Sequence, residues 1–134
     1  MEKEILKFKE LTQKIIGCSF NVYNKLGFGY LESVYENCMM IELFKCGLNS
    51  ENQKPIIIYY DEFIVGEFFA DILVENEIIL ELKSIRSLNI MHEIQLVNYL
   101  TSIRKDVGLL INFGEKKVEI KRKVRSLSEY GIHE

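Results

Sequence analysis

Apolar side chains near the amino terminus recur every three or four residues, which is the spacing of one helix face. The recurring positions are Ile5, Phe8, Leu11, Ile15, Cys18, Val22 and Leu26. They predict a long amphipathic helix that ends at Gly27, a residue suited to helix termination. A second helix is predicted from about residue 31 to residue 45, where Gly47 closes it.

Short apolar runs in the rest of the chain predict strands, at about 55–60, 63–74, 78–85, 107–112 and 117–122. A third helix is predicted over about 90–104, with Asn89 or Ser87 as its cap. It joins the third strand to the fourth, and such crossovers usually place two strands parallel in one sheet. The order αα-βββ-α-ββ therefore predicts an α/β domain with a mixed central sheet flanked by helices.

Three charged residues interrupt the apolar pattern of the second and third strands: Asp71, Glu81 and Lys83. A buried charge costs several kcal/mol unless it is paired or binds a metal. Two carboxylates beside a lysine are the groups that a metal-dependent phosphodiesterase needs. An ion pair at the edge of a sheet explains the same three charges equally well, so both interpretations stand.

The register of this hairpin follows from its pattern. A three-residue loop, Glu75–Glu77, suits Asn76, because asparagine tolerates the left-handed conformation that such loops need. The apolar positions Ala70, Ile72 and Val74 then pair with Leu82, Leu80 and Ile78. On the other face Asp71 lies opposite Glu81, and Phe69 lies opposite Lys83, because paired residues share a face. A loop shorter by one residue would separate the two acids.

The E-x-K spacing alone is not specific. It recurs at Glu115/Lys117 and Glu119/Lys121, where the surrounding sequence is charged and a solvated strand is the simpler interpretation. The apolar run from Gly108 to Gly114 is likewise interpreted as a buried strand followed by a turn.

The composition fits one folded domain over residues 1–134, with 48% hydrophobic and 28% charged residues. The amino terminus lacks the apolar run of a signal peptide, and no stretch is long enough to cross a membrane. Three cysteines without C-x-x-C spacing indicate reduced thiols and a cytoplasmic protein. The net charge is −3, although the carboxyl-terminal segment is basic. That basic tail could contact phosphates or could simply be a soluble end.

Two further groups of polar residues could lie near the hairpin. Glu32 and Tyr35 share one face at the start of the second helix, where an acid also stabilises the helix dipole. His92, Gln95 and Tyr99 line one face of the third helix. Their side chains could position a nucleotide or a catalytic lysine, or could merely face solvent.

Taken together, Asp71, Glu81-x-Lys83 and Gln95-x-x-x-Tyr99 resemble the PD-(D/E)XK nuclease superfamily, particularly branches with a Q-x-x-x-Y motif. More narrowly, Gly29-x-x-Glu32-x-x-Tyr35, H-E-I-Q-L-V-N-Y-L and G-L-L-I-N-F-G resemble the small bacterial GxxExxY family. The resemblance extends from about residue 10 to residue 122. One departure is Ala70, which stands where the superfamily's name-giving proline would precede the acid.

The resemblance implies a restriction-endonuclease-like core and a set of roles. Asp71 and Glu81, with the backbone carbonyl of Leu82 and with Glu32, would hold Mg²⁺ or Mn²⁺. Lys83 would be catalytic. The residues that would position the substrate are Tyr35, His92, Gln95 and Tyr99. The implied activity is hydrolysis of phosphodiester bonds, with DNA as the expected substrate. A second copy in a homodimer, or a protein partner, could supply further contacts that bind that substrate.

One alternative is an inactive nuclease-fold module that binds nucleic acid or a protein. Another is a small-molecule enzyme with the same metal site.

Overall fold

Two amphipathic helices, α2 (Lys9–Leu26) and α3 (Glu32–Lys45), begin the part of the chain that the computed structural model describes, residues 8–125. The predicted stops are confirmed. Gly27 has a φ of 69°, and its N–H donates to the carbonyl of Tyr23. Gly47 has a φ of 75°, and the N–H of Leu48 closes the end of α3 on the Leu43 carbonyl at 3.0 Å. The expected helical position Ile5 lies outside the described residues.

The five strands form one mixed sheet in the order β1-β2-β3-β4-β5. They are β1 (Ser50–Tyr60), β2 (Phe63–Val74), β3 (Ile78–Lys83), β4 (Val107–Phe113) and β5 (Val118–Val124). Neighbouring strands are antiparallel except β3 and β4, which are parallel and are joined by α4 (Ile90–Ile103). The predicted α/β fold, its element order and its parallel crossover are therefore confirmed.

The bounds of two strands differ from the prediction. β1 begins at Ser50 instead of about residue 55, because the polar stretch 50–54 pairs with β2 although its sequence has no apolar pattern. β3 ends at Lys83 instead of residue 85, because the amide of Asn112 binds both backbone groups of Ile85 and draws the chain out of the ladder.

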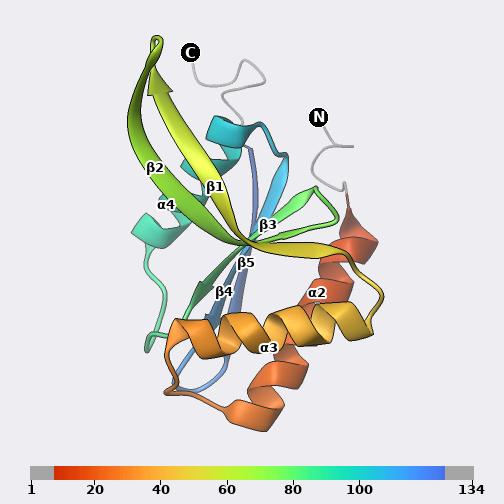
Figure 1. The fold of residues 1–134 in the computed structure, drawn as a ribbon. Helices are drawn as coiled ribbons and strands as arrows, with labels where there is room; N and C mark the ends of the chain where they lie inside the picture. The colour runs from red at the N-terminus through yellow and green to blue at the C-terminus, as the bar shows by residue number, and fades with distance from the viewer. Residues whose placement is uncertain (1–7, 126–134) are drawn as a thin grey trace.

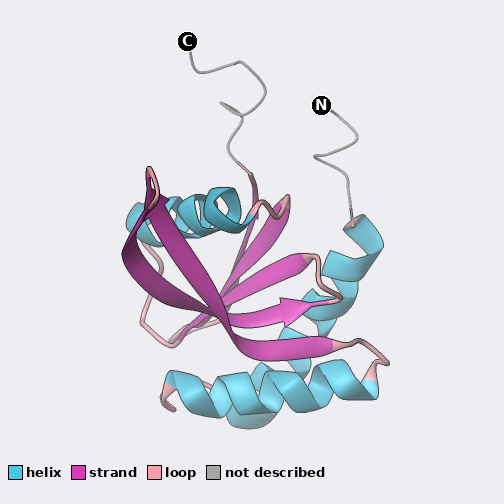
Figure 2. Cartoon of the chain, turned by 45° about the horizontal axis from the view of Figure 1, so that its top comes forward, coloured by secondary structure: helices cyan, strands magenta, loops and turns pink. Residues whose placement is uncertain are grey.

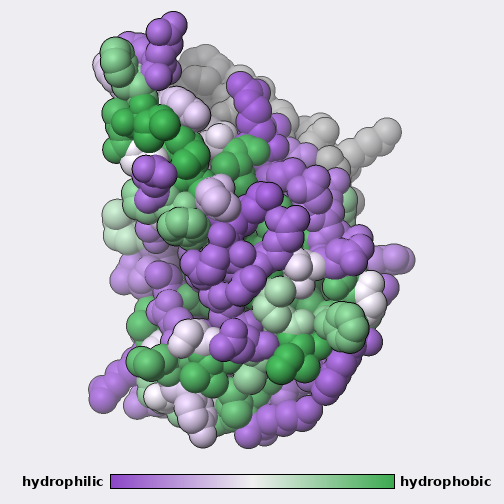
Figure 3. All heavy atoms as spheres, in the orientation of Figure 1, coloured by the Kyte–Doolittle hydropathy of each residue, from purple (hydrophilic) through white to green (hydrophobic). Residues whose placement is uncertain are grey.

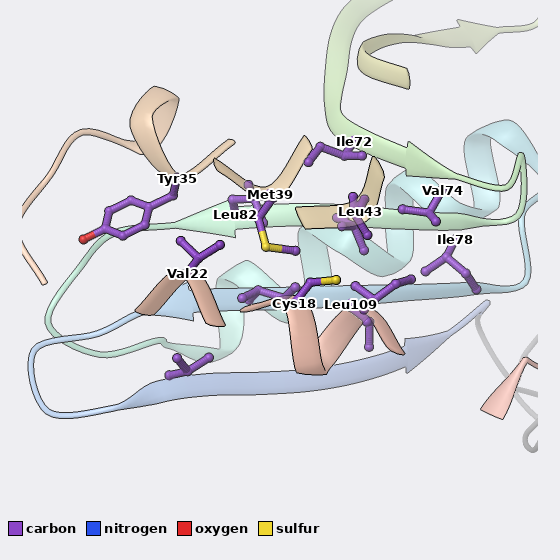
Figure 4. Close-up of a cluster of buried hydrophobic side chains, with 14 of the residues drawn as sticks. Cys18, Val22, Tyr35, Met39, Leu43, Ile72, Val74, Ile78, Leu82 and Leu109 are labelled. Carbon is purple, nitrogen blue, oxygen red and sulfur yellow. The ribbon is translucent and has the colours of Figure 1, made fainter. Parts of the chain in front are cut away.

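The sheet is covered on both faces, by α2 and α3 on one side and by α4 on the other (Figures 1 and 2). Figure 4 shows the larger core, where side chains of α2 and α3 such as Cys18, Val22, Met39 and Leu43 meet Ile72 and Leu82 of the sheet. The smaller core lies under α4. Burial of these two layers fixes the sheet between the helices, and α4 is thereby held against β4 and the β1–β2 hairpin.

The β1–β2 hairpin extends past the rest of the sheet (Figure 1). Below its charged turn, Asp61–Glu62, the hairpin exposes a group of apolar side chains, as the upper left of Figure 3 shows. The exposed apolar side chains there include Tyr59, Tyr60, Phe63, Ile64, Val65, Phe68 and Phe69.

Two side chains of the basic carboxyl-terminal segment form ion pairs within the fold. Lys123 contacts Glu93 at 3.1 Å and Arg125 contacts Asp106 at 3.1 Å. The end of the predicted basic tail lies outside the described residues. Across residues 8–125, none of the helices combines the length and the apolar character that crossing a bilayer requires.

Candidate active site

The ladder between β2 and β3 stops where the two acids begin. Its last pair is Ile72 with Leu80, which confirms the predicted register, since Leu73 pairs with Ile79 and Val74 with Ile78. The turn is left-handed at two residues, with φ of 52° at Glu75 and 57° at Asn76. Sequence reasoning had assigned that conformation to Asn76 alone.

Beyond the last pair, side chains replace the backbone ladder. Asp71 Oδ2 accepts the N–H of Leu82 at 2.7 Å, and the N–H of Asp71 approaches Glu81 Oε1 at 3.4 Å. The expected pairs Ala70–Leu82, Asp71–Glu81 and Phe69–Lys83 do not form, because the ladder between β2 and β3 ends at Ile72 and Leu80. The two strands therefore separate at the acids, and each carboxylate reaches toward the backbone of the opposite strand.

A kink in β1 accompanies this separation. Gln53 has a φ of 53°, a left-handed conformation that is uncommon for residues other than glycine. Beside this kink, successive even-numbered residues of β2 point into different cores of the protein. Ile72 packs with the α2–α3 core, whereas Ala70 packs with the α4 core. Asp71 thus lies where the hairpin turns from one face of the sheet toward α4.

The position of both acids disfavours their ionised forms. Burial, opposed in part by the Leu82 N–H and reinforced by the charges of Glu36 and Glu32, raises the pKa of Asp71 to about 6. Burial and the charge of Asp71 raise the pKa of Glu81 to about 8, although Glu81 lies beside the positive charge of Lys83. Only 8% of Glu81 is exposed. A cation bound between two close carboxylates favours the ionised form of both.

Helix α3 brings two more acids to this site. Glu32 is its first residue, and Glu36 lies one turn later on the same face. Glu36 is held in place by Gln53 Nε2 at 2.8 Å and Asn52 Nδ2 at 3.2 Å, which are donors from the kinked part of β1. Sequence reasoning missed Glu36. The i, i+4 spacing from Glu32 was the available signal.

Lys83 and the loop after it are positioned by a buried asparagine. Asn112, which pairs with Lys83 across the parallel ladder, is fully buried. Its amide accepts the N–H of Ile85 at 3.0 Å and donates to the Ile85 carbonyl at 2.9 Å. It also donates to Glu119 Oε1 at 2.8 Å, and that oxygen accepts the N–H of Leu88 at 3.0 Å.

These contacts correct one expectation from the sequence. The solvated-strand interpretation is wrong for Glu119, because its carboxylate secures the loop between β3 and α4. The buried strand predicted for the run from Gly108 to Gly114 is confirmed as β4, and all of its residues are buried. Sequence reasoning missed the role of Asn112, the polar residue in that strand.

Helix α4 places Gln95 and Tyr99 at the edge of the site. Gln95 Nε2 donates to the Tyr99 hydroxyl at 2.8 Å, so the predicted pair is joined directly. Burial raises the pKa of Tyr99, and the charges of Glu81 and Asp71 raise it further. Tyr99 also belongs to the same buried cluster as Ala70, the residue that precedes Asp71 on β2.

The structure gives His92 a contact within its own helix. Asn89 caps α4 with its side-chain oxygen, and His92 Nδ1 accepts the N–H of Asn89 at 3.2 Å in a capping box. Asn89, and not Ser87, is therefore the cap of the two that were predicted.

Tyr35 is fully buried, and its position does not suit the role expected of it. Its ring stacks on Phe113 with centroids 4.3 Å apart, and its hydroxyl donates to the carbonyl of Gly27. It has no exposed surface for a substrate. Its contacts hold the turn between α2 and α3, the segment that places Glu32 near the acids.

The donor set at this site fits a hard divalent ion in part. Asp71 and Glu81 offer carboxylate oxygens, and the Leu82 carbonyl faces the same gap, because the N–H and C=O of a strand residue point to the same side. Within residues 8–125, no three His, Cys, Asp or Glu side chains are gathered closely enough to hold a metal ion. Glu32 thus contributes charge near the pair, and the structure does not bring it into a three-carboxylate cluster.

Comparisons with known proteins show the family of the chain and a similar fold. A family model described as the PD-(D/E)XK nuclease superfamily matches residues 9–123. The crystal structure of SSO0001 is similar, with a TM-score of 0.58 and 20% sequence identity over 75% of this chain and 52% of that chain. The chain thus spans about half the length of that protein, and identity at this level concerns the fold alone. A comparison with curated proteins gives no match.

Proposed function

The chain belongs to the PD-(D/E)XK nuclease superfamily, and from this membership and the geometry of its acids we propose that it hydrolyses phosphodiester bonds in nucleic acid with the help of a divalent metal ion. The observation that carries the proposal is the opening of the β2–β3 ladder at Asp71 and Glu81, with the charge of Lys83 acting on both acids. The motif Gly29-x-x-Glu32-x-x-Tyr35 supports the narrower assignment to the GxxExxY family.

Each residue has a role in this proposal. Asp71, Glu81 and the Leu82 carbonyl would hold Mg²⁺ or Mn²⁺, and Glu32 would complete the metal shell directly or through water. A bound ion would supply Lewis-acid stabilisation of charge on the phosphate and would lower the pKa of the attacking water. Lys83 contributes a fixed positive charge to the phosphate as negative charge develops on its oxygens. Gln95 and Tyr99 hold the substrate strand, and DNA is the proposed substrate.

The experiment is cleavage of labelled single- and double-stranded DNA and RNA, in Mg²⁺, in Mn²⁺ and in EDTA. We expect wild type to cut at least one substrate only when metal is present. Lys83→Ala should lose about 100-fold or more in rate, because a preorganised charge at the reacting phosphate typically contributes that much. The matched control is Lys54→Ala, at a half-exposed lysine of β1 that is paired with Glu51. Equal rates for the two variants would contradict the assignment of Lys83.

A second candidate function is a module that binds a protein partner without catalysis. The exposed apolar side chains of the β1–β2 hairpin favour it, because contiguous apolar surface often marks an interaction site. Absence of cleavage on all four substrates, together with absence of metal binding at Asp71 and Glu81, would favour this second function.

A further inference from the structure

A groove of about 700 Å³ lies between the β1–β2 hairpin and α4. The hairpin contributes Ile58 and Phe68, and the other residues that line the groove, among them Gln95, Asn98 and Tyr99, belong to α4. Among the described residues that line it, His92 and Tyr99 are the ionisable ones. The volume lies within the range of ligand pockets, and a lining without lysine or arginine suits an uncharged aromatic group better than a phosphate.

An aromatic wall forms one side of this groove. The rings of Phe68 and Tyr99 lie 5.5 Å apart and are tilted by 36°. At that distance they contact each other, so a ligand ring can stack on the open side of Phe68 but not between the two. Phe68 is 43% exposed and so presents such a side, whereas Tyr99 is buried. The Phe68 ring also leans over Gly66, whose missing side chain leaves space for it.

Polar groups stand at the edge of the aromatic wall. Gln95 uses one amide N–H for the Tyr99 hydroxyl and keeps a second N–H and a carbonyl oxygen, while Asn98 adds another exposed amide. An amide that offers both a donor and an acceptor matches the mixed hydrogen-bonding edge of a nucleobase. The groove therefore combines a stacking surface with groups that can bind the edge of the stacked ring.

The groove adjoins the candidate active site. Tyr99, which lines the groove, belongs to the same buried cluster as Ala70, the residue that precedes Asp71 on β2. A nucleotide with its phosphate at the acids therefore has its base beside the groove.

We propose that this groove binds an unpaired nucleobase, so that the substrate is single-stranded nucleic acid or the single-stranded part of a longer molecule. The inference rests on the proposed function, because that function places the phosphate at Asp71, Glu81 and Lys83. A paired base in a duplex has its faces covered by stacking and its edge occupied, so it cannot enter. Stacking of bases on aromatic side chains is a general means of binding single strands.

The test is binding of a short fluorescein-labelled oligothymidylate, followed by anisotropy in EDTA, where metal-dependent cleavage cannot occur. The comparison probes are an abasic strand of the same length and a duplex. Phe68→Ala removes the stacking surface, and Phe68→Tyr keeps it. Phe63→Ala is the matched control, because Phe63 is 71% exposed on the same hairpin and does not line the groove. Thermal unfolding confirms that each variant is folded.

We expect Phe68→Ala to weaken binding of oligothymidylate about 5- to 100-fold, the range measured for loss of one stacked base. Phe68→Tyr and Phe63→Ala should bind as wild type does, and the abasic strand and the duplex should bind wild type weakly. The inference is overturned if wild type binds no oligothymidylate, if abasic and base-containing strands bind equally, or if Phe68→Ala binds like Phe63→Ala. It is also overturned if Phe68→Ala only abolishes self-association in sedimentation, because the groove is then an interface between copies.

Failure of this inference is distinguishable from failure of the proposed function. If cleavage requires Lys83 but binding does not depend on Phe68, the base-binding proposal fails and the nuclease proposal stands. If binding requires Phe68 and bases but no substrate is cleaved, the nuclease proposal fails and the groove remains a binding site for single strands.

Discussion

Asp71 Oδ2 accepts the backbone N–H of Leu82 at 2.7 Å, across the gap where β2 and β3 cease to pair. This bond satisfies a backbone donor that the interrupted ladder would otherwise leave without a partner. It also fixes the Asp71 carboxylate beside Glu81. The same interruption that opens the sheet therefore builds the pair of acids.

The raised pKa of Glu81 makes the stability of the protein depend on pH. Its pKa is about 8 in the folded protein and about 4.3 in an unfolded chain. Between these values the folded state holds the proton and the unfolded state does not, so the contribution of Glu81 to stability falls as the pH rises from about 4 to about 8. Glu81→Gln removes this dependence. Without metal we expect the variant to exceed wild type in unfolding free energy by about 1 kcal/mol or more at about pH 8.

Urea unfolding in EDTA, at about pH 5 and about pH 8, measures this difference. Glu77→Gln, in the turn of the same hairpin, is the control and should follow wild type at both values. A Glu81→Gln protein that is less stable than wild type by the same amount at both pH values would contradict the assignment.

The Tyr35→Phe variant tests whether the Tyr35 hydroxyl stabilises the fold or contacts the substrate. The phenylalanine ring keeps the stack on Phe113, but it loses the bond to the Gly27 carbonyl and the bond from the Tyr30 N–H. We expect a loss of about 1–2 kcal/mol of unfolding free energy, because a hydrogen bond typically contributes about 1 kcal/mol. The affinity of the folded protein for Mn²⁺ should not change. Tyr30→Phe, at a half-exposed tyrosine, is the control. Unchanged stability with reduced cleavage would restore the expectation that Tyr35 positions substrate.

Much of the fold follows from local patterns, and the hairpin shows why. The register follows from Asn76 and from the one wholly apolar face of the hairpin, because a shift by one residue would set charged residues against that face. Asp71 and Glu81 follow from the same argument. The kink at Gln53 and the bonds that hold Glu36 do not, because they depend on contacts between β1 and α3. Asn112 and Glu119 read as strand residues, and their bonds to the β3–α4 loop exist only in the folded sheet.

Asn112→Ala should release the loop that follows Lys83. The buried amide makes three hydrogen bonds, and its removal leaves the N–H and the carbonyl of Ile85 without a partner. We expect a loss of about 2–3 kcal/mol of unfolding free energy. The amides of Ile85 and Leu88 should exchange faster with deuterium than in wild type. Asn37→Ala, at an exposed position of α3, is the control. Unchanged exchange at both amides would show that Asn112 does not organise this loop.

The central claim is that Asp71 and Glu81 together hold one divalent ion. Titration with Mn²⁺, followed by electron paramagnetic resonance of the free ion, counts the bound ions directly. We predict one Mn²⁺ per wild-type chain, a weakening of about 10-fold or more in Asp71→Asn and in Glu81→Gln, and unchanged binding in Glu77→Gln. Binding that is the same in wild type and in the folded Asp71→Asn and Glu81→Gln proteins, or no binding at all, would contradict the claim.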